Sequence, residues 1–106
     1  MVFLPAAFNM TTGPAHWELS IRMRALDNQI FVCGAAPARN MDASYTAYGN
    51  SRVANPWGEV IAYGDEREGI ILVDVKGSQI EDVREKLPLL KHRRTDLYKM
   101  EFVDKK

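Results

Sequence analysis

Two unbroken apolar runs limit most strongly which fold this chain can adopt: VFL at residues 2–4 and IFVCGAA at 30–36. Runs without polar alternation are typical of strands that are covered on both faces. Between them, residues 14–28 are rich in helix formers and begin with Pro14, which suits the first turn of a helix. Strand, loop, helix and strand in this order predict a parallel crossover unit, and therefore an α/β fold.

The predicted helix carries apolar residues on more than one side, so we expect contacts on more than one of its faces. Glu18 and Arg22 are spaced for an i,i+4 ion pair. The strand at 2–4 needs a neighbour on each side, and only later segments of the chain can supply one.

The second half of the chain alternates turn signals with short strand-like runs. Asn55, Pro56 and Gly58 stand in the preferred order for a type I turn, which predicts a hairpin. Ser78 and Glu81 have the spacing of a capping box, and Pro88 stops the helix that they open. The expected elements are a loop at 37–48, strands at 51–54, 59–63 and 70–75 with a polar turn at 64–69, a helix at 78–87, and a tail at 89–106 without a clear period.

The length and the charge of the chain limit which classes of partner it can bind. The 106 residues suffice for one small domain. Lys plus Arg and Asp plus Glu both number 14, so the basic surplus of a nucleic-acid-binding surface is missing. No apolar run approaches the length of a membrane span, and the N-terminal run has no basic start and contains Pro5. We expect a cytoplasmic protein, with the mitochondrial matrix as an alternative, that binds neither nucleic acid nor membrane.

Few residues could carry chemistry by themselves. Cys33 lies inside an apolar run without a neighbouring charge, so it is predicted to be a small buried hydrophobic residue rather than a reactive thiolate. His16 and His92 are the only histidines, and their spacing from other ligand types matches no metal-binding pattern. His16 follows a loop, so it either points into a pocket or caps and packs the helix. No cofactor and no metal ion is expected.

Four segments occur in an order and spacing that resemble one known family. They are LPAAFNMTTGPAHWE at 4–18, RALDNQ at 24–29, GNSRVANPWGEV at 49–60 and RRTDLY at 93–98. Together they span nearly the whole length of the chain, from residue 4 to residue 98. The chain resembles the C-terminal part of a carbon–nitrogen hydrolase of the nitrilase family, with the omega-amidases as the most similar branch.

The resemblance implies a four-layer α-β-β-α sandwich, of which residues 1–106 are a partial, C-terminal domain. It implies a mechanism with a glutamate, a lysine and a cysteine, in which the thiolate attacks an amide carbon, ammonia leaves, and water releases the acid. In the family those three residues precede the strand that begins at residue 2, so this chain is expected to hold no catalytic residue. The implied substrates are small ω-monoamides of dicarboxylates, such as α-ketoglutaramate.

A substrate pocket wall is what this chain can contribute. Residues that directly follow a parallel strand lie where α/β folds usually bind ligands. We therefore expect the substrate-binding residues to be Phe8, Asn9, Met10, Thr11 and Thr12, with His16 as a further candidate.

Three readings stay open at the level of sequence. The chain is part of an omega-amidase whose remaining residues are supplied elsewhere, a small non-catalytic α/β protein that serves binding or assembly, or a truncated product without function. The amide substrate binds only in the first case, and the isolated chain is expected to be inactive in all three. Because half a sandwich leaves an edge and an apolar face open, we expect a dimer or higher homo-oligomer, or a chain that needs a partner, rather than a stable monomer.

Overall fold

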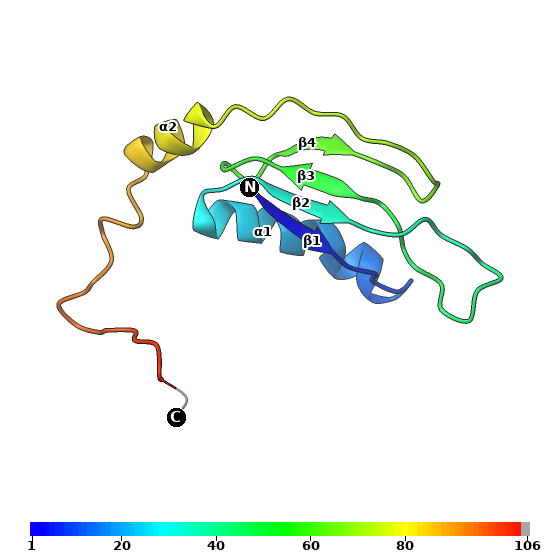
Figure 1. Ribbon diagram of the computed structural model, residues 1–106, viewed down its shortest axis with the longest axis horizontal. Coiled ribbons are helices and arrows are strands. Elements are labelled where there is room, and N and C mark those ends of the chain that lie inside the picture. Colours follow the sequence, from blue (N-terminus) through cyan, green and yellow to red (C-terminus); the bar gives the residue numbers. More distant parts are fainter. Residues whose placement is uncertain (105–106) are drawn as a thin grey trace.

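A computed structural model describes residues 1–104, and it contains one mixed four-stranded sheet with a helix against one face (Figure 1). The strands are β1 (Val2–Pro5), β2 (Val32–Ala35), β3 (Arg52–Ala54) and β4 (Val60–Tyr63), and they lie in the sheet in the order in which they occur in the chain. β1 and β2 are parallel, whereas the β2–β3 and β3–β4 pairs are antiparallel. The predicted α/β crossover unit is therefore confirmed.

The helix between β1 and β2 has two parts. A π-helical turn, η1 (Gly13–Trp17), leads into α1 (Glu18–Asn28), which ends where Gln29 takes the left-handed conformation at φ 51°. The expected helix at 14–28 is thus confirmed, with a wider first turn that the sequence did not predict. The Glu18–Arg22 ion pair forms at 3.9 Å, and Glu18 also accepts a hydrogen bond from Arg52 Nε at 3.2 Å.

The core lies between α1 and the sheet. One stripe of the helix is buried against strand residues that share a face, and the core is Trp17, Ile21, Ala25, Val32 and Ala54. Other apolar residues of α1, among them Leu19 and Met23, are exposed. The helix therefore uses one of its apolar faces within this chain.

β1 differs from the expectation of a strand covered on both faces. Phe3 remains 66% exposed, and Val2 and Pro5 are exposed as well. There are two reasons: α1 covers only one face of the sheet (Figure 1), and β1 lies at the edge, with β2 on one side and no strand of the described residues on the other.

The β3–β4 hairpin closes as predicted. The Gly58 amide donates to the Asn55 carbonyl at 2.9 Å, which is the hydrogen bond of a β-turn. Gly58 has φ +79°, a conformation that favours glycine.

The expected strand at 70–75 is wrong. The chain turns after β4 and runs back toward α2 (Ser78–Lys86) without entering the sheet (Figure 1). The expected capping box at Ser78 is also wrong, because the N-cap is Gly77 and no side chain caps the helix. Backbone carbonyls take that role, since the amides of Gln79 and Ile80 donate to Lys76 and Gly77 at 3.1 and 3.0 Å.

A side-chain hydrogen bond holds the end of α2 against the end of α1. Gln29 is 2% exposed, and its Nε2 donates to the Leu87 carbonyl at 2.7 Å. Beyond α2 the described tail is exposed and runs away from the body (Figure 1). The radius of gyration is 16.8 Å, against about 13 Å for a compact domain of about 100 residues. The chain is therefore an open structure.

Candidate functional site

The candidate site lies at the carboxyl ends of β1 and β2. Because these strands are parallel, the loops that leave them emerge at the same edge of the sheet. The two loops are joined by main-chain contacts: the Tyr48 amide donates to the Phe8 carbonyl at 2.7 Å, and Asn9 and Ala47 form a β-bridge. The Tyr45 hydroxyl also donates to the Ala7 carbonyl at 2.7 Å.

Asn9 organises the loop after β1. Its Oδ1 accepts hydrogen bonds from the Thr11 amide at 3.0 Å, the Thr12 amide at 2.8 Å and the Thr12 hydroxyl at 3.0 Å. Its main-chain carbonyl accepts from the Gly13 amide at 2.8 Å. The Asn9 oxygens are thus occupied in shaping the loop.

Phe8 connects this loop to the core. Its ring lies 5.0 Å from the Trp17 ring at an interplanar angle of 56°, a tilted aromatic pair. Phe8 is half-buried and lines a cavity of about 230 Å³ together with Leu4, Pro5, Ala6, Trp17, Ser20, Ile21 and Arg24.

The other predicted site residues lie nearer to solvent. Met10 is 42% exposed, Thr11 and His16 are exposed, and Thr12 is half-buried. The structure thus brings Asn9, Thr11 and Thr12 into one hydrogen-bonded loop. It places His16 in η1, on an exposed position of the next turn.

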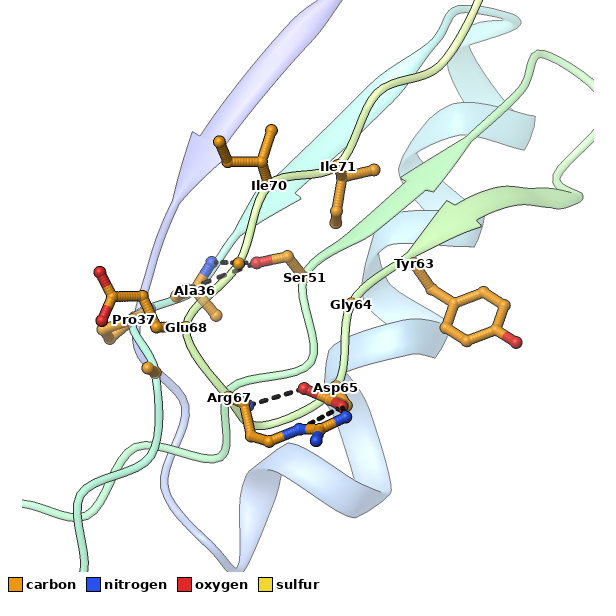
Figure 2. Close-up of a pocket in the computed structure, with 12 residues that line it drawn as sticks. Ala36, Pro37, Ser51, Tyr63, Gly64, Asp65, Arg67, Glu68, Ile70 and Ile71 are labelled. Atoms are coloured by element: carbon orange, nitrogen blue, oxygen red, sulfur yellow. Dashed lines mark hydrogen bonds and ion pairs between the residues drawn. The ribbon is translucent and has the colours of Figure 1, made fainter.

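A cavity of about 260 Å³ lies at the same end of the sheet, between the chain after β2 and the turn after β4. Figure 2 shows Ser51 in its wall: the Ser51 Oγ accepts from the Ala36 amide at 3.0 Å and donates to the Ala36 carbonyl at 3.4 Å. Asp65 and Arg67 form an ion pair at its rim, and the Arg67 guanidinium lowers the pKa of the Asp65 carboxyl. Because these two charges compensate each other, the rim offers a ligand no net charge from this pair.

Arg39 was not singled out from the sequence. Its amide donates to the Glu66 carbonyl at 2.7 Å and its Nη2 to the Tyr48 carbonyl at 2.8 Å, while the guanidinium lies 5.6 Å from the centre of the Tyr48 ring. The side chain thus holds Arg39 against Tyr48 within the loop after β2, and the Arg39 amide joins that loop to the turn after β4. No local pattern marks this role, whereas Ser51 lies within the G-x-S segment on which the resemblance rests.

Cys33 does not have the surroundings of a nucleophile. It is half-buried in the middle of β2, and burial raises the pKa of its thiol. A raised pKa disfavours the thiolate, which is the reactive form. The direction of the pKa shift agrees with the prediction, although the side chain is less buried than expected.

Within residues 1–104, no group of three or more His, Cys, Asp or Glu side chains is arranged to hold a metal ion. No helix of this part of the chain combines the length and the hydropathy needed to cross a bilayer.

Comparison with known proteins decides the family. The family model described as carbon-nitrogen hydrolase matches residues 2–85. The chain belongs to the carbon–nitrogen hydrolase family. It is 50% identical to omega-amidase NIT2 of Danio rerio over 103 residues and 48% identical to that of Homo sapiens over 101 residues. These alignments cover 97% and 95% of this chain but 37% of each relative, so the chain spans little more than a third of the length of the relatives it matches.

Solved structures of the same superfamily confirm the fold. Nit3 of Saccharomyces cerevisiae, a member of branch 10 of the nitrilase superfamily, superimposes with a TM-score of 0.80 at 45% identity, covering 87% of this chain and 35% of that one. The NitFhit protein of C. elegans gives a TM-score of 0.83 at 38% identity, covering 92% and 24%. The predicted nitrilase-like fold is therefore present in part, as one sheet and the helix that covers one face of it.

Proposed function

We propose that this carbon–nitrogen hydrolase chain is the C-terminal part of an omega-amidase that hydrolyses small ω-monoamides of dicarboxylates, such as α-ketoglutaramate, to the acid and ammonia. The observation that carries the proposal is the 48–50% identity to omega-amidases, which extends over at least 95% of the chain. The aligned part of the chain includes the loops at the carboxyl ends of β1 and β2, where a substrate would lie.

In this proposal the loop after β1 forms one wall of the substrate pocket. Phe8 supplies an apolar surface that is fixed by Trp17, and the Asn9–Thr12 hydrogen bonds hold the loop in one shape. Met10 and Thr11 are exposed enough to meet a substrate, and His16 is a further candidate one turn along η1.

Covalent catalysis must come from residues outside this chain. The reaction needs a thiolate that attacks the amide carbon and a group that protonates the departing ammonia. The only thiol here is Cys33, and burial raises its pKa in the middle of β2. The isolated chain should therefore have no amidase activity.

The test compares two samples in an assay of ammonia release from α-ketoglutaramate. The first is the purified chain, and the second is the chain co-expressed with the part of Danio rerio omega-amidase that has no counterpart in it. Turnover in the second sample alone supports the proposal. Turnover by the isolated chain that Cys33→Ala abolishes would make Cys33 the nucleophile and refute it.

Failure of both samples to turn over the amide would favour a non-catalytic binding or assembly protein. That reading has its own support, because α1 and the sheet form a buried core without any further chain.

We propose that the protein lies in the cytosol or the mitochondrial matrix, where a free thiol such as Cys33 stays reduced. Fractionation of the source cells tests this location.

A further inference from the structure

A further cavity, of about 350 Å³, lies between the β3–β4 turn and α2, away from the candidate site. Val32 at the start of β2 pairs with Ala54 at the end of β3, so this turn lies beside the amino end of β2. The candidate site lies at the opposite, carboxyl end of that strand. Figure 1 shows α2 at the same end of the sheet as the turn. The lining residues are Trp57, Glu59, Gln79, Asp82, Val83 and Lys86.

Trp57 offers this cavity an aromatic surface. The turn fixes its backbone, because the Trp57 amide donates to Asn55 Oδ1 at 3.0 Å, yet the residue is 50% exposed. Trp17, by contrast, is buried in the core, and its indole Nε1 donates to the Asn50 carbonyl. Val83 is buried and supplies an apolar surface to the same cavity. An open indole beside an apolar residue in a cavity is a surface that a ligand can cover.

The charges around the cavity are not compensated. Glu59 and Asp82 are exposed carboxylates, and within residues 1–104 neither forms an ion pair. Glu59 Oε2 accepts a hydrogen bond from the neutral Asn55 amide group at 3.2 Å. Lys86 lies four residues after Asp82 but is likewise in no ion pair of the described chain. Two negative charges and one positive charge therefore leave the cavity with an excess of negative charge.

We propose that this cavity binds a small organic cation, an alkylammonium group whose charge lies over the Trp57 ring, beside the Glu59 and Asp82 carboxylates. The face of an indole attracts a cation within about 6 Å of the ring centre, and more strongly than the face of Phe or Tyr does. The alkyl part of the ligand would contact Val83. A metal ion fits less well, because two carboxylates are fewer donors than a site within the protein normally supplies. The proposal does not depend on the amidase function.

The experiment is an NMR titration of the isotope-labelled whole chain with choline chloride, at an ionic strength kept constant with sodium chloride. The comparison ligand is the neutral alcohol in which a carbon atom replaces the choline nitrogen. We expect choline to shift the indole Nε1–H signal of Trp57 and the amides of Gln79 and Val83 in a saturable way. The indole signal of Trp17 should stay in place, and the alcohol should bind about fivefold more weakly or less.

Substitutions at the cavity should change choline affinity in opposite directions. Trp57→Leu should weaken it by about fivefold or more. Glu59→Gln and Asp82→Asn should each weaken it by about two- to fivefold. Lys86→Gln should strengthen it by a similar factor, because it removes a charge of the same sign as the ligand. The matched control is Asp42→Asn, an exposed acid in the loop after β2, which should leave the affinity unchanged.

Equal affinity for choline and the alcohol, or the absence of saturable shifts, overturns the proposal. So does weaker binding in Lys86→Gln, or unchanged binding in a folded Trp57→Leu variant. Circular dichroism checks the fold of each variant. If Trp57→Leu does not fold, the double variant Glu59→Gln/Asp82→Asn decides, since it keeps the indole and should lose about fivefold or more in affinity. Unchanged affinity in that double variant overturns the proposal as well.

Discussion

Replacing Gly34 with alanine should test whether the core between α1 and the sheet is packed as described. A Cβ atom at position 34 would lie 2.3 Å from Ile21 Cδ1 and 2.9 Å from Trp17 Cζ2. Carbon atoms in contact are normally about 3.5–4.0 Å apart, so the Ile21 methyl group must move by more than about 1 Å. Overpacking of this kind costs about 1–3 kcal/mol.

The assay is urea unfolding of the purified chain, followed by circular dichroism. With an m-value of about 2 kcal/mol/M, a loss of about 2 kcal/mol lowers the unfolding midpoint by about 1 M. Gly77→Ala is the matched control, because a Cβ there meets nothing within 4 Å and its φ of −56° suits alanine. That variant should be neutral or gain up to about 1 kcal/mol.

A second substitution identifies the atoms responsible. Ile21→Val removes the Cδ1 that the new Cβ would strike, at a cost of about 0.5–1.5 kcal/mol by itself. In the double variant with Gly34→Ala, the total loss of stability should be clearly smaller than the sum of the two single losses. The difference is a coupling of about 1 kcal/mol. If Gly34→Ala unfolds at the same midpoint as Gly77→Ala, or if the two losses are simply additive, helix α1 does not lie on β2 as described.

Three further outcomes are expected. Cys33 should react more slowly with a thiol reagent in the native chain than in urea, because burial raises its pKa and the fold favours the protonated thiol. The stability of the fold should therefore decrease as the pH rises above about 8.5. Urea titrations of Cys33→Ala at the same pH values should lack this decrease. Gln29→Ala should cost about 1–2 kcal/mol and speed amide exchange in α2, because it leaves the Leu87 carbonyl without its donor at 2.7 Å. Trp17→Phe should cost about 1 kcal/mol in urea unfolding beyond any packing loss, because it removes the 2.7 Å hydrogen bond from Nε1 to the Asn50 carbonyl.

Local signals predicted most of the elements correctly. Pro14 and the apolar stripe of residues 17–25 specify a helix from within the segment, and the Asn55–Gly58 turn closes through a hydrogen bond between residues three apart. Such features form from neighbouring residues, so one sequence reveals them. The predicted Ser78 cap is a local feature that does not form. Main-chain carbonyls of the preceding turn accept the first helical amides instead.

The candidate site was predictable in position but not in its contacts. Parallel strands at 2–5 and 32–35 fix which end of the sheet carries the ligand loops. The contact of Ser51 with Ala36 spans 15 positions, and Arg39 reaches the carbonyl of Glu66 through the folded loops. These pairings depend on how the loops pack in three dimensions, and no spacing in the sequence encodes them.

The failure at 70–75 has a different cause, and it explains why helices and strands fared unequally. A helix satisfies its amides and carbonyls within its own segment, so α1 and α2 form wherever their sequences specify them. A strand is completed by a neighbour, and the propensity of a run such as IILVDV expresses how well it packs in a sheet rather than a preference of the isolated backbone. The run keeps its alternation of half-buried and exposed residues even though no ladder forms among residues 1–104. Residues 70–75 thus have the pattern of a strand in a sheet larger than the one that residues 1–104 form. The same argument applies to Phe3 on the open edge of β1.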